Sequence, residues 1–137
     1  MFSLVFPGQG SQKVGMCSDF YSKFKNVKEL FNNANDILKY NLTDVILKGP
    51  QEKLNQTEYA QPAIFLVGYS IIDTLKKECE FNFDNYNFFA GHSLGEYTAL
   101  AVSGSITFEQ ALILLKNRGR SMQEAVPIGT GGMLAVL

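Results

Sequence analysis

The strongest constraint on the fold of this 137-residue sequence is a serine between two glycines, at Gly-x-Ser-x-Gly spacing from Gly91 to Gly95. An apolar run at residues 88–90 precedes the motif, and a helical pattern follows it from Glu96. With this spacing a strand turns into a helix so sharply that a Cβ at either flanking glycine would clash. The hydroxyl of Ser93 then projects from the bend, beside free N–H groups that favour negative charge. The motif predicts a nucleophile elbow, against the plainer alternative of an ordinary Gly-Ser turn.

Two short apolar segments predict strands, Phe2 to Phe6 and Phe88 to Gly91. Because helical patterns separate them, we expect a parallel sheet covered by helices on both faces, which is an α/β fold. A third strand is predicted from Met133 to Leu137. Two strands make too small a sheet to be stable alone, and the third has no evident neighbour, so the sequence is interpreted as the front part of a larger fold.

The expected helices lie between and after these strands. Gly49-Pro50 is a helix stop signal, Pro62 is placed at a first helical position, and Thr107 with Gln110 matches a capping box. The predicted helical segments are residues 19–40 as one or two helices, 43–48, 62–77, 96–102 and 107–125.

Composition excludes several function classes. The formal net charge is −1, and the basic residues form no cluster beyond Lys76-Lys77 and Arg118 with Arg120, so we expect no nucleic-acid partner. Cys17 and Cys79 lack metal-ligand spacing and are predicted to be free thiols, with no metal and no cofactor. No apolar stretch approaches the length of a membrane span, and no signal peptide is evident, so we expect a soluble cytoplasmic protein.

A serine nucleophile needs a base within hydrogen-bond reach, and His92 is the one histidine of the sequence. Adjacent side chains diverge at a sharp elbow, so His92 is interpreted as a residue that braces the turn. The base is therefore expected from outside these residues.

The sequence offers two candidate backbone donors for an oxyanion hole. One is the backbone N–H of Leu94, directly after the serine. The second is expected from Gln9 in the glycine-containing loop Pro7–Gly10, which follows the first strand. The alternative is that this loop only connects a strand to a helix.

Arg118 lies on an apolar helix face. Helical periodicity aligns it with Phe108, Ala111, Leu115 and Met122. An arginine there needs an anionic partner, and its planar fork suits a carboxylate. A protein carboxylate such as Glu96 or Glu109 and a ligand carboxylate both fit. The neighbouring Gly119 indicates close packing of a backbone or a ligand.

Four motifs occur in order: Phe6–Gln12, Gln61–Ala63, Gly91–Tyr97 and Arg118-Gly119, followed by residues 122–127. With them the sequence closely resembles bacterial malonyl-CoA:acyl-carrier-protein transacylases. The resemblance implies transfer of a malonyl group from malonyl-CoA to acyl carrier protein through an ester on Ser93, in fatty-acid biosynthesis. It also implies that Arg118 grips the malonyl carboxylate, and that Gln9 and Leu94 form the oxyanion hole.

The resemblance further implies a hydrolase-like α/β core over residues 1–127, and the first strand of a ferredoxin-like subdomain over 128–137. The family's catalytic histidine, and a glutamine that orients it, come from a later part of the fold that this sequence does not contain. Three alternatives stay open. A second chain supplies the missing part, or the chain is an inactive remnant that binds carrier protein, or it is a serine esterase of the α/β-hydrolase class.

Overall fold

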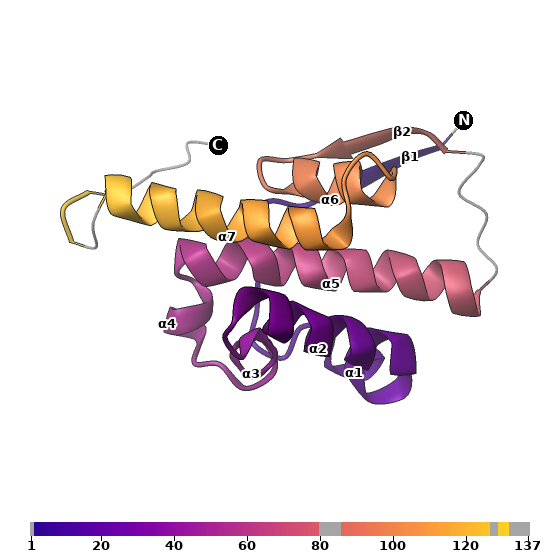
Figure 1. Ribbon diagram of the computed structural model, residues 1–137, viewed down its shortest axis with the longest axis horizontal. Helices are drawn as coiled ribbons and strands as arrows, with labels where there is room; N and C mark the ends of the chain where they lie inside the picture. The colour runs from indigo at the N-terminus through magenta and orange to yellow at the C-terminus, as the bar shows by residue number, and fades with distance from the viewer. Residues whose placement is uncertain (1, 80–85, 127–128, 132–137) are drawn as a thin grey trace.

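The computed structural model describes residues 2–79, 86–126 and 129–131, and it confirms an α/β fold. This part of the chain forms two strands and seven helices, and Figure 1 shows how they are arranged. In chain order the elements are β1 (Phe2–Phe6), α1 (Ser18–Lys23), α2 (Lys25–Leu38), α3 (Leu42–Lys48), α4 (Gln51–Leu54), α5 (Thr57–Glu78), β2 (Tyr86–Gly91), α6 (Gly95–Val102) and α7 (Phe108–Ala125). The strand expected from Met133 to Leu137 lies outside the described residues.

The two strands form a parallel pair, as predicted, with Leu4 opposite Phe89 and Val5 opposite Ala90. One face of the pair is covered: Phe6 packs against Ile72 of α5 and against α6. The other face is open among the described residues, since Val5 is 72% exposed and Phe88 57% exposed. The expectation of helices on both faces is therefore wrong for this part of the chain, because α5 and α6 lie on the same side of the sheet.

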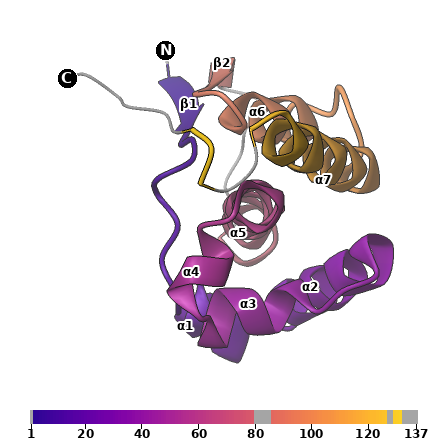
Figure 2. The same ribbon diagram turned by 90° about the vertical axis from the view of Figure 1, so that its left-hand side faces the viewer.

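Helix α5 is the centre of the molecule. Figures 1 and 2 show it between α6 and α7 on one side and the α1–α4 group on the other. Part of its buried face joins the main core, whose large, fully buried side chains include Phe31 of α2, Phe65 of α5, and Leu112 and Leu115 of α7. Each of these side chains is fully buried, and burial of such a side chain stabilises the fold by about 1.5–3 kcal/mol.

The start of α5 differs from the prediction. Pro62 lies inside the helix, which begins five residues earlier at Thr57. A proline there lacks the N–H that would bond to the carbonyl of Glu58 one turn back. The hydroxyl of Tyr40 donates to that carbonyl instead, at 3.4 Å. A tertiary contact thus occupies the carbonyl that Pro62 leaves free, and no local pattern announces such a contact.

The remaining predicted helices are confirmed. Residues 19–40 form α1 and α2, and α7 starts at the predicted capping box, with the Thr107 hydroxyl and the Gln110 amide bonding each other's backbone N–H. Helix α4 is an additional single turn that the sequence patterns did not indicate.

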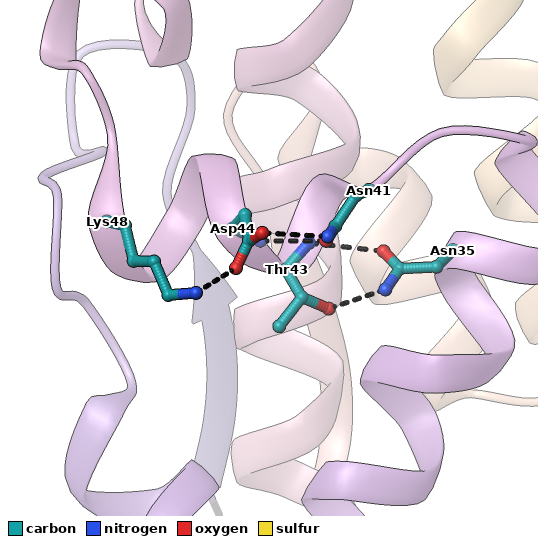
Figure 3. Close-up of polar contacts among 5 residues, drawn as sticks. All are labelled: Asn35, Asn41, Thr43, Asp44 and Lys48. Carbon is teal, nitrogen blue, oxygen red and sulfur yellow. Dashed lines mark hydrogen bonds and ion pairs between the residues drawn. The ribbon is translucent and has the colours of Figure 1, made fainter.

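Side-chain hydrogen bonds fix the start of α3, as Figure 3 shows. The Asn41 side chain accepts from the N–H of Asp44 at 3.0 Å, which caps the helix. The amide of Asn35 both accepts from the N–H of Thr43 and donates to its hydroxyl, and Lys48 pairs with Asp44 at 2.7 Å. The two bonds of Asn35 hold the start of α3 against α2. Within the described residues, no helix is long and apolar enough to span a membrane.

Candidate active site

The turn between β2 and α6 has the geometry of a nucleophile elbow. Ser93 adopts a left-handed backbone conformation with φ of 54°, which is strained for a residue with a side chain. A Cβ on Gly91 would overlap the backbone of Gly95, and one on Gly95 would lie 2.5 Å from the carbonyl oxygen of Phe6. Only glycine fits at both places, so the sequence prediction of an elbow is confirmed.

Ser93 opens into a cleft of about 500 Å³, within the size range of small-molecule sites. The loop after β1, the start of α5, the elbow and α7 all contribute to its wall. The residues that line it are Gln9, Gly10, Gln12, Thr57, His92, Ser93 and Met122. Ser93 itself is exposed, so its hydroxyl is accessible to a ligand.

Arg118 reaches this hydroxyl from α7. Its Nη2 donates to Oγ of Ser93 at 3.2 Å, and its Nη1 donates to Oε1 of Gln61 at 2.7 Å. Neither Glu96 nor Glu109 is its partner, and none of the ion pairs among the described residues includes Arg118. The guanidinium is thus held by two neutral groups. Of the two alternatives that the sequence left open, the protein carboxylate has no support here.

The close approach of α7 to α5 brings Arg118 into place. A Cβ on Gly119 would lie 2.7 Å from the carbonyl oxygen of Thr57 and 2.9 Å from Cα of Glu58. The prediction of close packing at Gly119 is confirmed, and the neighbour is the backbone of α5.

Gln61 is a polar residue of the site that was not predicted to have a role. It is fully buried, with Oε1 bonded to Arg118 and Nε2 bonded to the sulfur of Met122 at 3.3 Å. A signal was present in the sequence, because Gln61 is a lone amide within an otherwise apolar run from Ala60 to Leu66. A buried amide needs hydrogen-bond partners, and here they are site residues.

His92 lies beside Ser93 but is not bonded to it. Its ring packs against Gly8, where an added Cβ would meet Nδ1 and the His92 carbonyl oxygen. Its backbone N–H donates to the carbonyl of Phe6 at 3.0 Å, which ties the elbow to the end of β1. This position suits the bracing role that the sequence analysis gave it, and a base for Ser93 stays unassigned.

The two expected oxyanion donors are the backbone N–H groups of Gln9 and Leu94. Leu94 follows Ser93 at the start of α6, and Gln9 lines the same cleft as the serine. Within the described part of the chain, neither backbone N–H donates to another residue. The Gln9 side chain donates to the hydroxyl of Thr57 at 3.4 Å, which links its loop to α5.

Among the described residues, no three His, Cys, Asp or Glu side chains are grouped to hold a metal ion. Both cysteines are free, and burial raises the pKa of the Cys17 thiol to about 11.

Known proteins resemble the chain over nearly its whole length. The family described as "Acyl transferase domain" matches residues 3–137. The malonyl CoA-acyl carrier protein transacylase of Haemophilus influenzae is 43% identical over 136 residues, which are 99% of this chain and 43% of the relative.

Solved structures agree with this match. An acyl carrier protein S-malonyltransferase from Vibrio cholerae superposes with a TM-score of 0.86 at 43% identity, over 94% of this chain and 41% of the other. A malonyl-transacylase solved in complex with a type II PKS acyl-carrier protein gives 0.84 at 43% identity, over 92% of this chain and 40% of the other. The chain spans about two fifths of the length of these relatives.

Proposed function

Because the chain belongs to the acyl transferase domain family, and within it corresponds to the N-terminal portion of malonyl CoA-acyl carrier protein transacylases, we propose that it carries the serine and the carboxylate-binding arginine of a malonyl transferase. The substrates are malonyl-CoA and the thiol of an acyl carrier protein, as the names of its relatives suggest.

One observation supports this proposal most: the guanidinium of Arg118 lies 3.2 Å from Oγ of Ser93 and has no carboxylate partner among the described residues. An unpaired cation beside a nucleophile favours an acyl group that carries its own negative charge. The malonyl group does, since its free carboxylate lies two carbons from the thioester carbonyl. Each charge-assisted hydrogen bond to that carboxylate contributes about 1.5–3 kcal/mol.

The proposed reaction has two halves. Oγ of Ser93 attacks the thioester carbonyl, the hydroxyl proton passes to a base, and the C–S bond breaks to release coenzyme A as the thiol. The carrier-protein thiol then gives its proton to the base and attacks the serine ester. A new C–S bond forms, the C–O bond to Ser93 breaks, and Oγ takes the proton from the base. The N–H groups of Gln9 and Leu94 hold the carbonyl oxygen while it is negatively charged.

The base is proposed to come from outside these residues. His92 packs against Gly8 and makes no bond to Ser93, so the site needs a second histidine for full activity. The relatives are more than twice as long as this chain, which leaves room in them for such a residue.

The open sheet face agrees with a larger core. Val5 and Phe88 are exposed on it, and an apolar cavity of about 330 Å³ runs beside β1 against Ile64 and Ile72 of α5. We propose that residues 1–127 belong to a hydrolase-like core and that 128–137 begin a ferredoxin-like subdomain.

A cytoplasmic location stays a prediction, and one relative, from Drosophila melanogaster, is named as mitochondrial.

Labelling tests the function. The protein, at its full encoded length, is incubated with radiolabelled malonyl-CoA and then denatured, and the label bound to protein is counted. We expect one label per chain, lost in Ser93→Ala and retained in Ser105→Ala, which removes an exposed hydroxyl outside the cleft. Absence of label, or label retained in Ser93→Ala, contradicts the proposal. Faster turnover of neutral esters than of malonyl thioesters would favour an esterase.

A further inference from the structure

Gln61 connects the interior of α5 to the candidate active site. Its side chain is 0% exposed, and both polar atoms of its amide are used. Oε1 accepts from Nη1 of Arg118 at 2.7 Å, and Nε2 donates to the sulfur of Met122 at 3.3 Å. Arg118 and Met122 are one turn apart on α7, so a single amide bridges α5 to both residues.

Met122 gives the amide its direction. If the amide were rotated by half a turn, its NH₂ group would face the guanidinium, and two donors would meet without an acceptor. The sulfur accepts from the NH₂ group and leaves Oε1 toward Arg118. The guanidinium is thereby held at one end by Gln61, and Nη2 at the other end points to Ser93.

The neutrality of Gln61 matters as much as its position. A glutamate has nearly the same shape and would also bond to Arg118, but it would neutralise the cation inside the protein. We propose that Gln61 is a positioning residue that fixes Arg118 while leaving its charge available, and so determines the preference for an acyl group with a free carboxylate. This inference rests on the proposed function, because it explains how the same site selects its substrate.

The test measures binding without chemistry. In the Ser93→Ala background of the protein at its full encoded length, dissociation constants for malonyl-CoA and acetyl-CoA are measured at pH 8 by calorimetry. We expect Gln61→Glu to weaken the binding of malonyl-CoA at least tenfold and to change the binding of acetyl-CoA less than threefold. The reason is that the new carboxylate pairs with the guanidinium of Arg118. If Gln61 only packs, Gln61→Glu would weaken the binding of both ligands equally.

Gln123→Glu is the matched control. It adds the same charge on the residue after Met122, where the side chain is partly exposed and donates to the carbonyl of Val126. In Gln123→Glu, the preference for malonyl-CoA over acetyl-CoA is expected to stay within threefold of the value for the parent protein. An equal loss in Gln123→Glu and Gln61→Glu would show a general charge effect and overturn the inference.

A second variant covers failure to fold. If circular dichroism shows that Gln61→Glu is unfolded, Gln61→Met keeps the length of the side chain and removes the acceptor. We expect it to reduce the preference for malonyl-CoA about tenfold. A preference unchanged in whichever variant folds overturns the inference and leaves the proposed function standing. A parent protein with no preference for malonyl-CoA overturns both.

Discussion

The Nη2 atom of Arg118 lies 3.2 Å from Oγ of Ser93, although the two residues are 25 positions apart, with Ser93 in the turn between β2 and α6 and Arg118 on α7. The elbow presents the hydroxyl, and α7 brings the guanidinium to it across the N-terminal part of α5. Gly119 permits this approach, because its missing side chain lets α7 contact the backbone at Thr57 and Glu58. Backbone packing thus sets the distance between the two groups.

The first prediction concerns Arg118→Ala. Acyl-enzyme formation from malonyl-CoA is expected to slow about 100-fold, because a partly exposed arginine that makes two charge-assisted hydrogen bonds contributes about 3 kcal/mol. Formation from acetyl-CoA, which has no carboxylate to bind, is expected to change less than threefold. Rapid-quench measurement of both initial rates, in the protein at its full encoded length, tests the ratio.

Arg120→Ala is the control for this experiment. Arg120 lies two residues further along α7, is exposed, and pairs with Glu124, so its removal changes the net charge equally without touching the cleft. Equal losses with both acyl groups in Arg118→Ala would show that the arginine does not select the carboxylate.

Much of the fold follows from local patterns. The elbow needs glycine at Gly91 and Gly95 for steric reasons that any chain shares, and the capping box at Thr107 is a local hydrogen-bond pair. Both were therefore predictable from the sequence. The start of α5 was not, because Pro62 is tolerated inside the helix through the side chain of Tyr40, more than twenty residues away.

The site was predictable in part for the same reason. Ser93 follows from its motif, and the placement of Arg118 on an apolar face indicated a partner that the sequence could not choose. The choice depends on which groups α5 brings to α7, and these are the amide of Gln61 and the backbone around Thr57. Those are contacts between helices, which periodicity within one helix does not encode.

The second prediction concerns Gly119→Ala. The added methyl group would lie 2.7 Å from the carbonyl oxygen of Thr57, so α7 must move away from α5. We expect the free energy of unfolding to fall by about 1–3 kcal/mol, as measured by urea titration. Gly68→Ala on α5 is the control, because its Cβ would meet only a methyl group of Thr98 at 3.4 Å. That variant is expected to be neutral or up to about 1 kcal/mol more stable. Equal effects at both glycines would contradict the packing argument.

The third prediction concerns the start of α7. Thr107→Ala removes the hydroxyl that accepts from the N–H of Gln110 at 3.1 Å, so we expect a loss of about 1 kcal/mol in the free energy of unfolding. Thr107→Ser keeps the acceptor and should stay within about 0.5 kcal/mol of the parent. Thermal and urea unfolding followed by circular dichroism measure both. A serine variant as unstable as the alanine variant would show that the hydrogen bond is not the cause.

The fourth prediction uses the two free thiols. Burial raises the pKa of Cys17 to about 11, whereas Cys79 is exposed. Since the thiolate is the reactive form, about one Cys17 in a thousand is reactive at pH 8 in the folded protein. Iodoacetamide should therefore modify Cys79 at least tenfold faster than Cys17, as read by mass spectrometry of peptides.

The raised pKa of Cys17 also predicts how its reactivity changes with pH. A raised pKa favours the neutral thiol in the folded state, so ionisation of Cys17 opposes folding between its ordinary value of 9.0 and about 11. Its alkylation rate should keep rising about tenfold per pH unit up to pH 10 in the folded protein. In 8 M urea, where burial is lost, the rate should level off near pH 9. A folded-state profile that levels off at the same pH as the unfolded one would mean that Cys17 is accessible to water, and that the packing of α1 against the core is looser than the structure shows.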